Sequence, residues 1–224
     1  MTARQSSCRQ TLRARQVADG RSGGRTLILL RHGRTAWNHA RRVQGQTDVS
    51  LDDEGRAQAK RVAEVLADLS PSLLWSSDLA RARETAATVA ATTGLTPSYD
   101  ARLREFSLGE REGISHEEYA VLAPDEFELF RQGVYDSAPG AEPTVVVRAR
   151  MFGVLGNLLA ALEPGQTGVA VSHGAAIRVA TGAMLGWPEN DFHTLGGLDN
   201  CGWVVLQEHP EISTLRLGAY NRTT

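Results

Sequence analysis

The sequence contains very little cysteine and very little lysine. Among its 224 residues there are only two cysteines, Cys8 and Cys201, and Lys60 is the single lysine. Two cysteines this far apart fit neither a disulfide framework nor a cysteine-based metal site, and they are typical of a reducing cytosol. We therefore expect a cytoplasmic protein, and the abundance of Arg, Ala, Gly and Val indicates a GC-rich bacterial genome.

Long apolar runs and a strong net charge are also missing. No run approaches the roughly 18 apolar residues that a membrane-spanning helix needs, so we expect no membrane partner. The formal net charge is only −2, whereas a nucleic-acid-binding domain would present a basic face. The hydrophobic fraction of 42% is ordinary for a globular protein, and the chain is long enough for one α/β domain with a full core.

The first 24 residues differ in composition from the rest. Arginines stand there among small polar residues, and Asp19 is the only acidic residue. The segment lacks the apolar core of a secretory signal. An organellar transit peptide has a similar composition, but we favour a disordered tail or a start codon placed upstream. The expected organisation is thus a tail at 1–24 and a single domain at 25–224.

Apolar runs and helical periodicities alternate along the domain. The expected strands cover residues 26–30, 72–77, 98–104, 167–171, 202–206 and 214–217. The expected helices cover residues 53–68, 78–91 with Asp78 as N-cap, 144–162 and 175–185. Residues 105–142 predict an irregular lid with helical turns near 116–121 and 124–131. This alternation predicts a three-layer α/β/α fold with a mostly parallel central sheet.

Three polar segments directly follow predicted strands. They are Arg31-His32-Gly33, residues 76–81 and Ser172-His173-Gly174. Ligands of parallel sheets bind outside the carboxyl ends of the strands, so we expect these segments to converge on one edge. Their residue types suit attack on a phosphate monoester, which needs a nucleophile, cations that meet the phosphate charge, and an acid for the leaving oxygen.

Each of these chemical tasks has a candidate residue. A neutral imidazole at His32 is a competent nucleophile, and Gly33 lets the backbone turn sharply and phosphate approach closely. Neighbouring arginines should lower the pKa of His32 and keep its ring neutral. Arg81 offers a planar fork of donors for phosphate oxygens. His173 can donate to a phosphate oxygen, and Glu105 is the carboxyl group best placed as proton donor and later as general base.

The same segments resemble the histidine phosphatase superfamily, also called phosphoglycerate mutase-like. The resemblance is carried by residues 29–38, 44–48, 76–82, 103–105, 172–174 and 195–200, which span nearly all the chain after residue 25. It implies the fold of that superfamily, with His32 as the phosphorylated residue. It further implies that Arg31, Arg81 and His173 form the phosphate pocket and that Glu105 is the acid and base.

The resemblance also implies a set of substrate contacts. The residues expected to bind the phosphate or the substrate body are Gly33, Asn38, Gln44, Gly45 and Gly174. No metal and no other cofactor is expected, because the arginines and the histidine supply the charge that a metal would otherwise provide. The expected partner is a small phosphorylated metabolite, and a homodimer is expected from the superfamily.

The lid favours a phosphatase over a phosphoglycerate mutase. Mutases of the superfamily carry a longer insertion with basic residues that retain the bisphosphate intermediate. Here the cations between Glu105 and Pro143, His116 apart, are only Arg111 and Arg131. Among phosphatases, the pattern is most similar to actinobacterial glucosyl-3-phosphoglycerate phosphatases, which implies a phosphorylated glycerate bearing a sugar as substrate.

Other functions stay open at this point. A mutase, a broad phosphomonoesterase and a phosphatase of a cobamide precursor all share the motifs. A non-catalytic phosphate-binding regulatory module is a further alternative, although such modules would be expected to lose His32 or Glu105.

Three positions leave the substrate contacts open. Arg34 stands where many superfamily members carry Glu or Gln, which could change the substrate preference. Residues 139–143 match the usual motif before the long helix only in part. Trp37 could shape the pocket mouth or pack on the lid.

Overall fold

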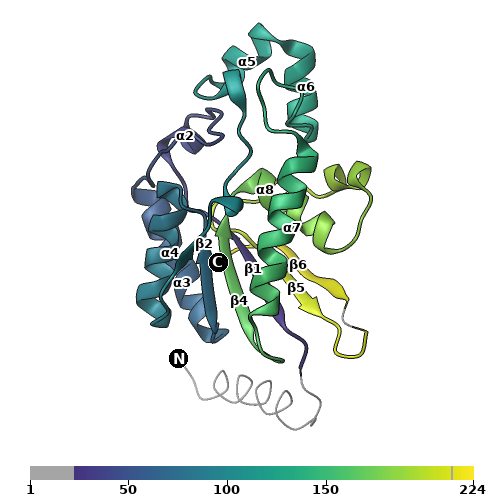
Figure 1. Cartoon of the computed structure of the whole chain (residues 1–224). Coiled ribbons are helices and arrows are strands. Elements are labelled where there is room, and N and C mark those ends of the chain that lie inside the picture. Colours follow the sequence, from purple (N-terminus) through teal and green to yellow (C-terminus); the bar gives the residue numbers. More distant parts are fainter. Residues whose placement is uncertain (1–22, 213) are drawn as a thin grey trace.

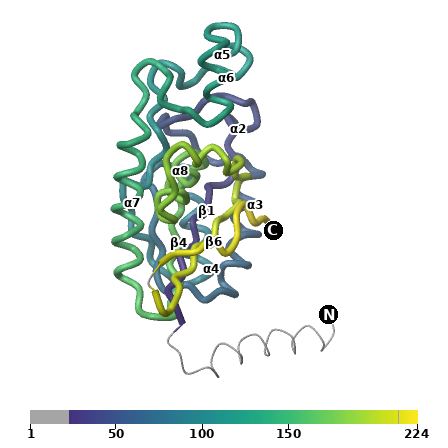
Figure 2. The backbone as a smooth tube through the Cα atoms, turned by 90° about the vertical axis from the view of Figure 1, so that its right-hand side faces the viewer, coloured from purple at the N-terminus to yellow at the C-terminus, as the bar shows by residue number. Residues whose placement is uncertain are grey.

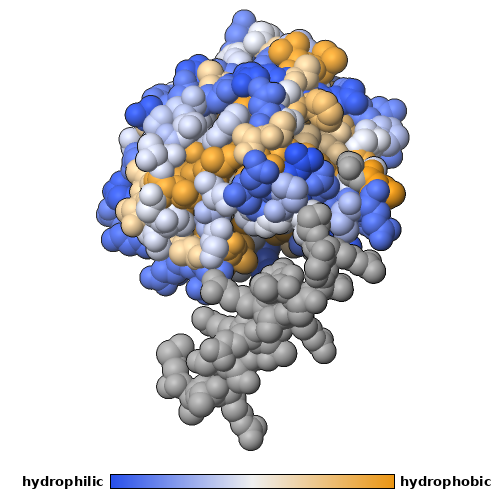
Figure 3. All heavy atoms as spheres, turned by 60° about the horizontal axis from the view of Figure 1, so that its bottom comes forward, coloured by the Kyte–Doolittle hydropathy of each residue, from blue (hydrophilic) through white to orange (hydrophobic). Residues whose placement is uncertain are grey.

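The computed structural model describes residues 23–212 and 214–224 (Figure 1). The tail predicted at 1–24 therefore lies outside the described residues, except for Gly23 and Gly24, which lead into the first strand. In the described part of the chain, no helix combines the length and the apolar character needed to cross a bilayer. The face in Figure 3 mixes hydrophilic residues with separate apolar patches.

The described residues form a six-stranded sheet in the order β3-β2-β4-β1-β5-β6. Its strands are β1 (Thr26–Arg31), β2 (Leu73–Ser76), β3 (Ser98–Tyr99), β4 (Thr167–Ser172), β5 (Trp203–Glu208) and β6 (Leu215–Arg222). The first four in sequence, β1 to β4, run parallel, whereas β5 pairs antiparallel with both β1 and β6. The prediction of a mostly parallel sheet is confirmed.

Helices cover both faces of the sheet. Leu27 and Leu29 of β1 pack in the cluster formed with α7 (Thr144–Ala160) and α8 (Gly174–Met184). Ile28 and Leu30 point the other way, into the cluster formed with α3 (Asp53–Asp68) and α4 (Ala80–Thr93). Figure 2 shows α7 on one side of the strands and α3 and α4 on the other. A strand buried on both faces reads as a continuous apolar run, which is why β1 was recognisable in the sequence.

The lid rises above the carboxyl edge of the parallel strands (Figure 1). The 3-10 turn η1 (Ala101–Leu103) precedes it, and its own elements are the 3-10 turn η2 (Gly109–Arg111) and the helices α5 (His116–Leu122) and α6 (Pro124–Gln132). The short helix α2 (Ala36–His39) lies beside it, and η3 (Glu189–Thr194) follows α8. Tyr119 is fully buried between Phe127 and Phe130, with ring centroids 5.3 and 5.5 Å away. These aromatic rings extend the hydrophobic cluster of α7 and α8 into the lid, and both predicted helical turns are confirmed.

Two predicted features are wrong. The strand expected at 98–104 is limited to Ser98 and Tyr99, because the Asp100 carboxylate then accepts from the Arg102 backbone N–H at 2.8 Å and starts η1. Asp78 does not cap α4, since its carboxylate binds the Arg104 guanidinium at 2.6 and 2.7 Å.

The cap of α4 comes from a distant loop. The backbone N–H of Ala80 donates to Asp48 at 2.7 Å. This contact fixes the loop that follows α2 against the start of α4.

Candidate active site

Strand pairing brings the two predicted site histidines together. β1 and β4 are parallel neighbours in which Arg31 pairs with Ser172, so the next residues, His32 and His173, leave the sheet side by side. Their ring centroids lie 5.1 Å apart, and the His32 backbone N–H donates to the Ser172 carbonyl at 3.0 Å. Both side chains are buried. The predicted convergence of the strand ends is therefore present in the structure.

His32 is held as a neutral ring with a defined tautomer. Its Nδ1 lies 2.7 Å from the Gly33 carbonyl oxygen, which can only accept, so Nδ1 carries the proton and Nε2 carries the lone pair. Burial first, and then the Arg81 and Arg31 cations, lower the pKa of His32 well below its usual value. The sequence predicted this direction from the arginines, but the larger contribution comes from burial. Nε2 is thus unprotonated at neutral pH, as a nucleophile requires.

Arg81 and His173 orient each other. Nε of Arg81 donates to Nδ1 of His173 at 3.2 Å, so the His173 proton lies on Nε2, 2.9 Å from the Ser77 hydroxyl. The remaining Arg81 nitrogens donate to the carbonyls of Gly45 and Thr47 at 2.8 and 2.9 Å. Burial lowers the pKa of Arg81 to about 10, which leaves it a cation at neutral pH. For His173 to donate to phosphate, as predicted, it would have to exchange its contact with Ser77.

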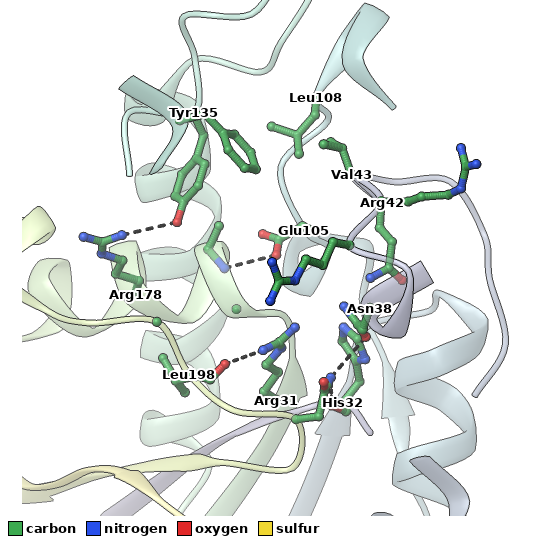
Figure 4. A pocket seen from close by; sticks show the side chains of 18 of the residues that line it. Arg31, His32, Asn38, Arg42, Val43, Glu105, Leu108, Tyr135, Arg178 and Leu198 are labelled. Carbon is green, nitrogen blue, oxygen red and sulfur yellow. Dashed lines mark hydrogen bonds between the residues drawn. The ribbon is translucent and has the colours of Figure 1, made fainter. Parts of the chain in front are cut away.

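Arg31 carries an unsatisfied donor. One guanidinium nitrogen donates to the Leu198 carbonyl (Figure 4), whereas its buried Nε has no hydrogen-bond partner among the described residues. A buried N–H without a partner is unfavourable, so an anion placed here would be stabilised. Burial lowers the pKa of Arg31, and the nearby Glu105 opposes this shift.

Glu105 is anchored at the N-terminus of α8. Its carboxylate accepts from the backbone N–H groups of Ala175 and Ala176 at 3.0 and 2.8 Å, and from that of Phe106 at 3.0 Å. The Glu105 carbonyl accepts from Arg150 of α7 at 2.9 Å. The donors fix the carboxylate in the pocket that His32 also lines (Figure 4).

Two side-chain amides complete the inner wall. Asn38 Oδ1 accepts from the Thr35 backbone N–H at 3.2 Å and from Asn200 Nδ2 at 3.1 Å. Gln44 Oε1 accepts from the Thr35 hydroxyl at 3.0 Å. Because the oxygens have these partners, the NH₂ groups of Asn38 and Gln44 can serve as donors to a ligand in the pocket.

These side chains line a cavity of about 380 Å³ under the lid. Of the predicted site residues, those on its wall are Arg31, His32, Asn38, Gln44, Gly45, Arg81, Glu105 and Gly174. Gly33 and His173 lie outside this lining. Gly33 donates its N–H to Thr85 at 3.1 Å, and a Cβ there would meet the Gly55 carbonyl at 2.5 Å.

Arg34, Trp37 and residues 139–143, whose contribution to substrate contacts the sequence left undecided, do not line the cavity. Arg34 pairs with Asp52 at 2.8 Å, and Glu142 of the 139–143 segment pairs with Arg150 at 2.8 Å. The Trp37 ring lies 3.6 Å from the Cβ position of Gly113, so it packs against the start of the lid.

Comparisons with known proteins agree with this geometry. A model of the histidine phosphatase superfamily (branch 1) matches residues 27–219. A glucosyl-3-phosphoglycerate phosphatase of Mycolicibacterium vanbaalenii is 39% identical over 83% of this chain and 85% of its own. The solved structure of a mycobacterial glucosyl-3-phosphoglycerate phosphatase with VO3 has a TM-score of 0.82 at 38% identity, covering 89% of this chain and all of that one. A probable phosphoglycerate mutase of Yersinia pestis is 35% identical over 84% of this chain and 88% of its own.

The chain belongs to the histidine phosphatase superfamily. The predicted fold and the prediction of a phosphatase of this superfamily are confirmed. Residues 23–212 and 214–224 contain no cluster of three or more His, Cys, Asp or Glu side chains arranged for a metal ion. The individual residue roles and the metal independence of the reaction stay predictions.

Sequence reasoning missed a residue that shapes this histidine phosphatase site. Glu112 of the lid accepts from the backbone N–H groups of Gln46, Thr47 and Leu108, each at 2.9 Å. It thereby holds the loop whose carbonyls bind Arg81. Gly45 has a φ of +54°, and a Cβ there would lie 2.0 Å from Glu112 Oε1. No pattern around Glu112 in the sequence indicates this tertiary role.

We predict that Gly45→Ala lowers kcat at least tenfold, because Glu112 and the Gly45 carbonyl cannot both keep their positions and Arg81 loses its orientation. Gly94→Ala is the matched control, since Gly94 also has a positive φ, +75°, but nothing lies within 4 Å of its Cβ position. Both variants should lose roughly 1 kcal/mol of stability from backbone strain. Steady-state kinetics and urea unfolding check this, and a Gly45→Ala enzyme with the kcat of Gly94→Ala would contradict it.

We also predict a specific loss of stability in acid. The pKa of His32 is lowered by folding from its ordinary 6.5, so below pH 6.5 the unfolded chain binds a proton that the folded one does not. The free energy of unfolding should therefore fall as pH decreases through 6.5, by up to about 1.4 kcal/mol per pH unit from this residue. Urea unfolding at several pH values should show a shallower decline for His32→Asn. If the free energy of unfolding depended on pH equally in wild type and His32→Asn, the claim that folding lowers the pKa of His32 would be wrong.

Proposed function

We propose that this protein hydrolyses glucosyl-3-phosphoglycerate, releasing phosphate through a phosphohistidine formed on His32. The observation that carries the proposal is the neutral His32 ring, whose Nδ1 is fixed on Gly33 so that Nε2 keeps its lone pair. The substrate follows from the similarity to glucosyl-3-phosphoglycerate phosphatases over most of both chains.

The first step forms the phosphoenzyme. Nε2 of His32 attacks phosphorus, the N–P bond forms and the P–O bond to the glycerate breaks. The protonated Glu105 gives its proton to the departing oxygen. Arg31 and Arg81 face the charge on the other phosphate oxygens, with the Asn38 and Gln44 amides as further donors.

The second step regenerates the enzyme. Glu105, now a carboxylate, takes a proton from water, whose oxygen attacks phosphorus. The N–P bond breaks, the electron pair returns to Nε2, and inorganic phosphate leaves. Glu105 thus acts first as acid and then as base in this mechanism, from a position fixed by the Ala175 and Ala176 N–H groups.

The upper part of the cavity supports a substrate larger than a simple phosphate ester. Leu108, Phe130 and Tyr135 of the lid line the same cavity as His32 and Glu105. Such an apolar and aromatic wall with a few polar groups is typical of small-molecule sites. A sugar ring attached to the glycerate would lie against this wall.

The alternative of a mutase has less support. The two lid arginines outside the pocket are engaged by carboxylates, Arg111 by Glu126 at 2.8 Å and Arg131 by Glu128 at 3.3 Å. They are therefore poorly placed to retain a bisphosphate intermediate. The cytoplasmic location and the homodimer stay predictions of the sequence.

We predict that glucosyl-3-phosphoglycerate is hydrolysed with a kcat/KM at least tenfold above that of p-nitrophenyl phosphate, and that excess EDTA leaves the rate unchanged. His32→Ala should lose on the order of 10³-fold or more in kcat, since it lacks the nucleophile. Phosphate release is the assay. A metal requirement, equal turnover of both substrates, or isomerisation of 3-phosphoglycerate in place of phosphate release would each count against the proposal.

A further inference from the structure

Five arginines line the cavity, and four of them have protein partners for their guanidinium groups. They are Arg31, Arg41, Arg42, Arg81 and Arg178. Arg31 and Arg81 donate to backbone carbonyls, as described above. Arg42 donates to the Gly113 carbonyl at 2.6 Å. Arg178 donates to the carbonyls of Phe192 and His193 at 3.1 and 2.7 Å.

Arg41 is different from these four. Its side chain is exposed at the cavity wall, and its guanidinium makes no hydrogen bond and no ion pair with any residue between 23 and 212 or between 214 and 224. An arginine has five N–H donors in a planar fork, so this side chain is open to an anionic group in the cavity.

The backbone holds Arg41 in a conformation that few residues other than glycine adopt. Its φ is +48°, in the left-handed region, which costs roughly 1–2 kcal/mol for a residue with a side chain. Its N–H donates to the Asn38 carbonyl at 3.2 Å, and its own carbonyl accepts from the His116 N–H at 2.8 Å. Contacts from α2 on one side and α5 on the other therefore fix the backbone of this residue at the cavity wall.

We propose that Arg41 binds a carboxylate of the substrate and thereby selects phosphomonoesters that carry a second anionic group. The carboxylate matches the guanidinium fork in shape and charge. It comes from the glycerate part of the molecule, so the inference rests on the proposed function. The other pocket arginines would have to give up bonds to carbonyls before they could bind this group, whereas Arg41 would not.

Two substrates that differ only at the carboxylate test this role. In 3-phosphoglycerate the carbon farthest from the phosphate is a carboxylate, and in glycerol 3-phosphate it is a hydroxymethyl group. We expect Arg41→Gln to raise the KM for 3-phosphoglycerate about tenfold with kcat within twofold, and to leave both constants for glycerol 3-phosphate and p-nitrophenyl phosphate within twofold. Arg41→Lys, which keeps the charge, should recover part of the loss.

Arg131→Gln is the matched control. It removes one positive charge from a side chain that is exposed, as Arg41 is, but that does not line the cavity, so its KM for 3-phosphoglycerate should stay at the wild-type value. An Arg41→Gln enzyme that keeps the wild-type preference for 3-phosphoglycerate, or that loses activity equally on all three substrates, would overturn the role of Arg41 alone. Wild-type enzyme with no turnover of any phosphoglycerate would overturn the proposed function and this inference with it.

Discussion

Parallel pairing of β1 with β4 is the constraint on which the site depends. Because Arg31 pairs with Ser172, the residues that follow, His32 and His173, leave the sheet at the same height on adjacent strands. Both rings are buried at this edge, and burial is the first cause of their lowered pKa values. The fold thus supplies a neutral imidazole at His32, as the proposed nucleophile requires.

The arginines inside and outside the cavity differ in the groups that their guanidinium N–H donors bind. Inside the cavity, Arg31, Arg81 and Arg178 are oriented by backbone carbonyls. Arg42, at the wall, donates to a carbonyl and also lies 3.8 Å from the exposed Glu118 carboxylate. Outside the cavity, Arg34 and Arg104 pair with Asp52 and Asp78. Carbonyls fix the direction of a guanidinium without cancelling its charge, whereas a carboxylate partner would neutralise it. The cavity therefore keeps its positive charge for a phosphate ester.

Much of the fold and of the candidate site could be predicted from the sequence, because local signals carried it. The continuous apolar runs of β1 and β4 predicted these two strands. The polar segments that follow them in the sequence pointed to His32 and His173 as site residues. The features that were missed depend on partners distant in sequence. Asp48 caps α4 where Asp78 was expected, and Glu112 holds the loop around Gly45.

Arg41 is another residue whose environment depends on partners that the sequence pattern does not show. In the sequence it is one arginine among many beside Arg42. Only its backbone contacts with Asn38 of α2 and His116 of α5, and a guanidinium at the cavity wall that is unpaired among the described residues, distinguish it. Its neighbour Arg42 is bound to the lid, so adjacent identical residues have different environments. Patterns along one chain cannot separate such residues, since the difference arises from the three-dimensional contacts of each guanidinium.

The central claim is that Nε2 of His32 accepts the phosphoryl group. The most direct test is to mix enzyme with substrate labelled in the phosphate, quench in alkaline detergent within one turnover, and map the label by peptide mass spectrometry. The account predicts one labelled histidine, His32, whose label disappears on chasing with unlabelled substrate. Label on another residue, or rapid turnover with no covalent label at any time, would contradict it.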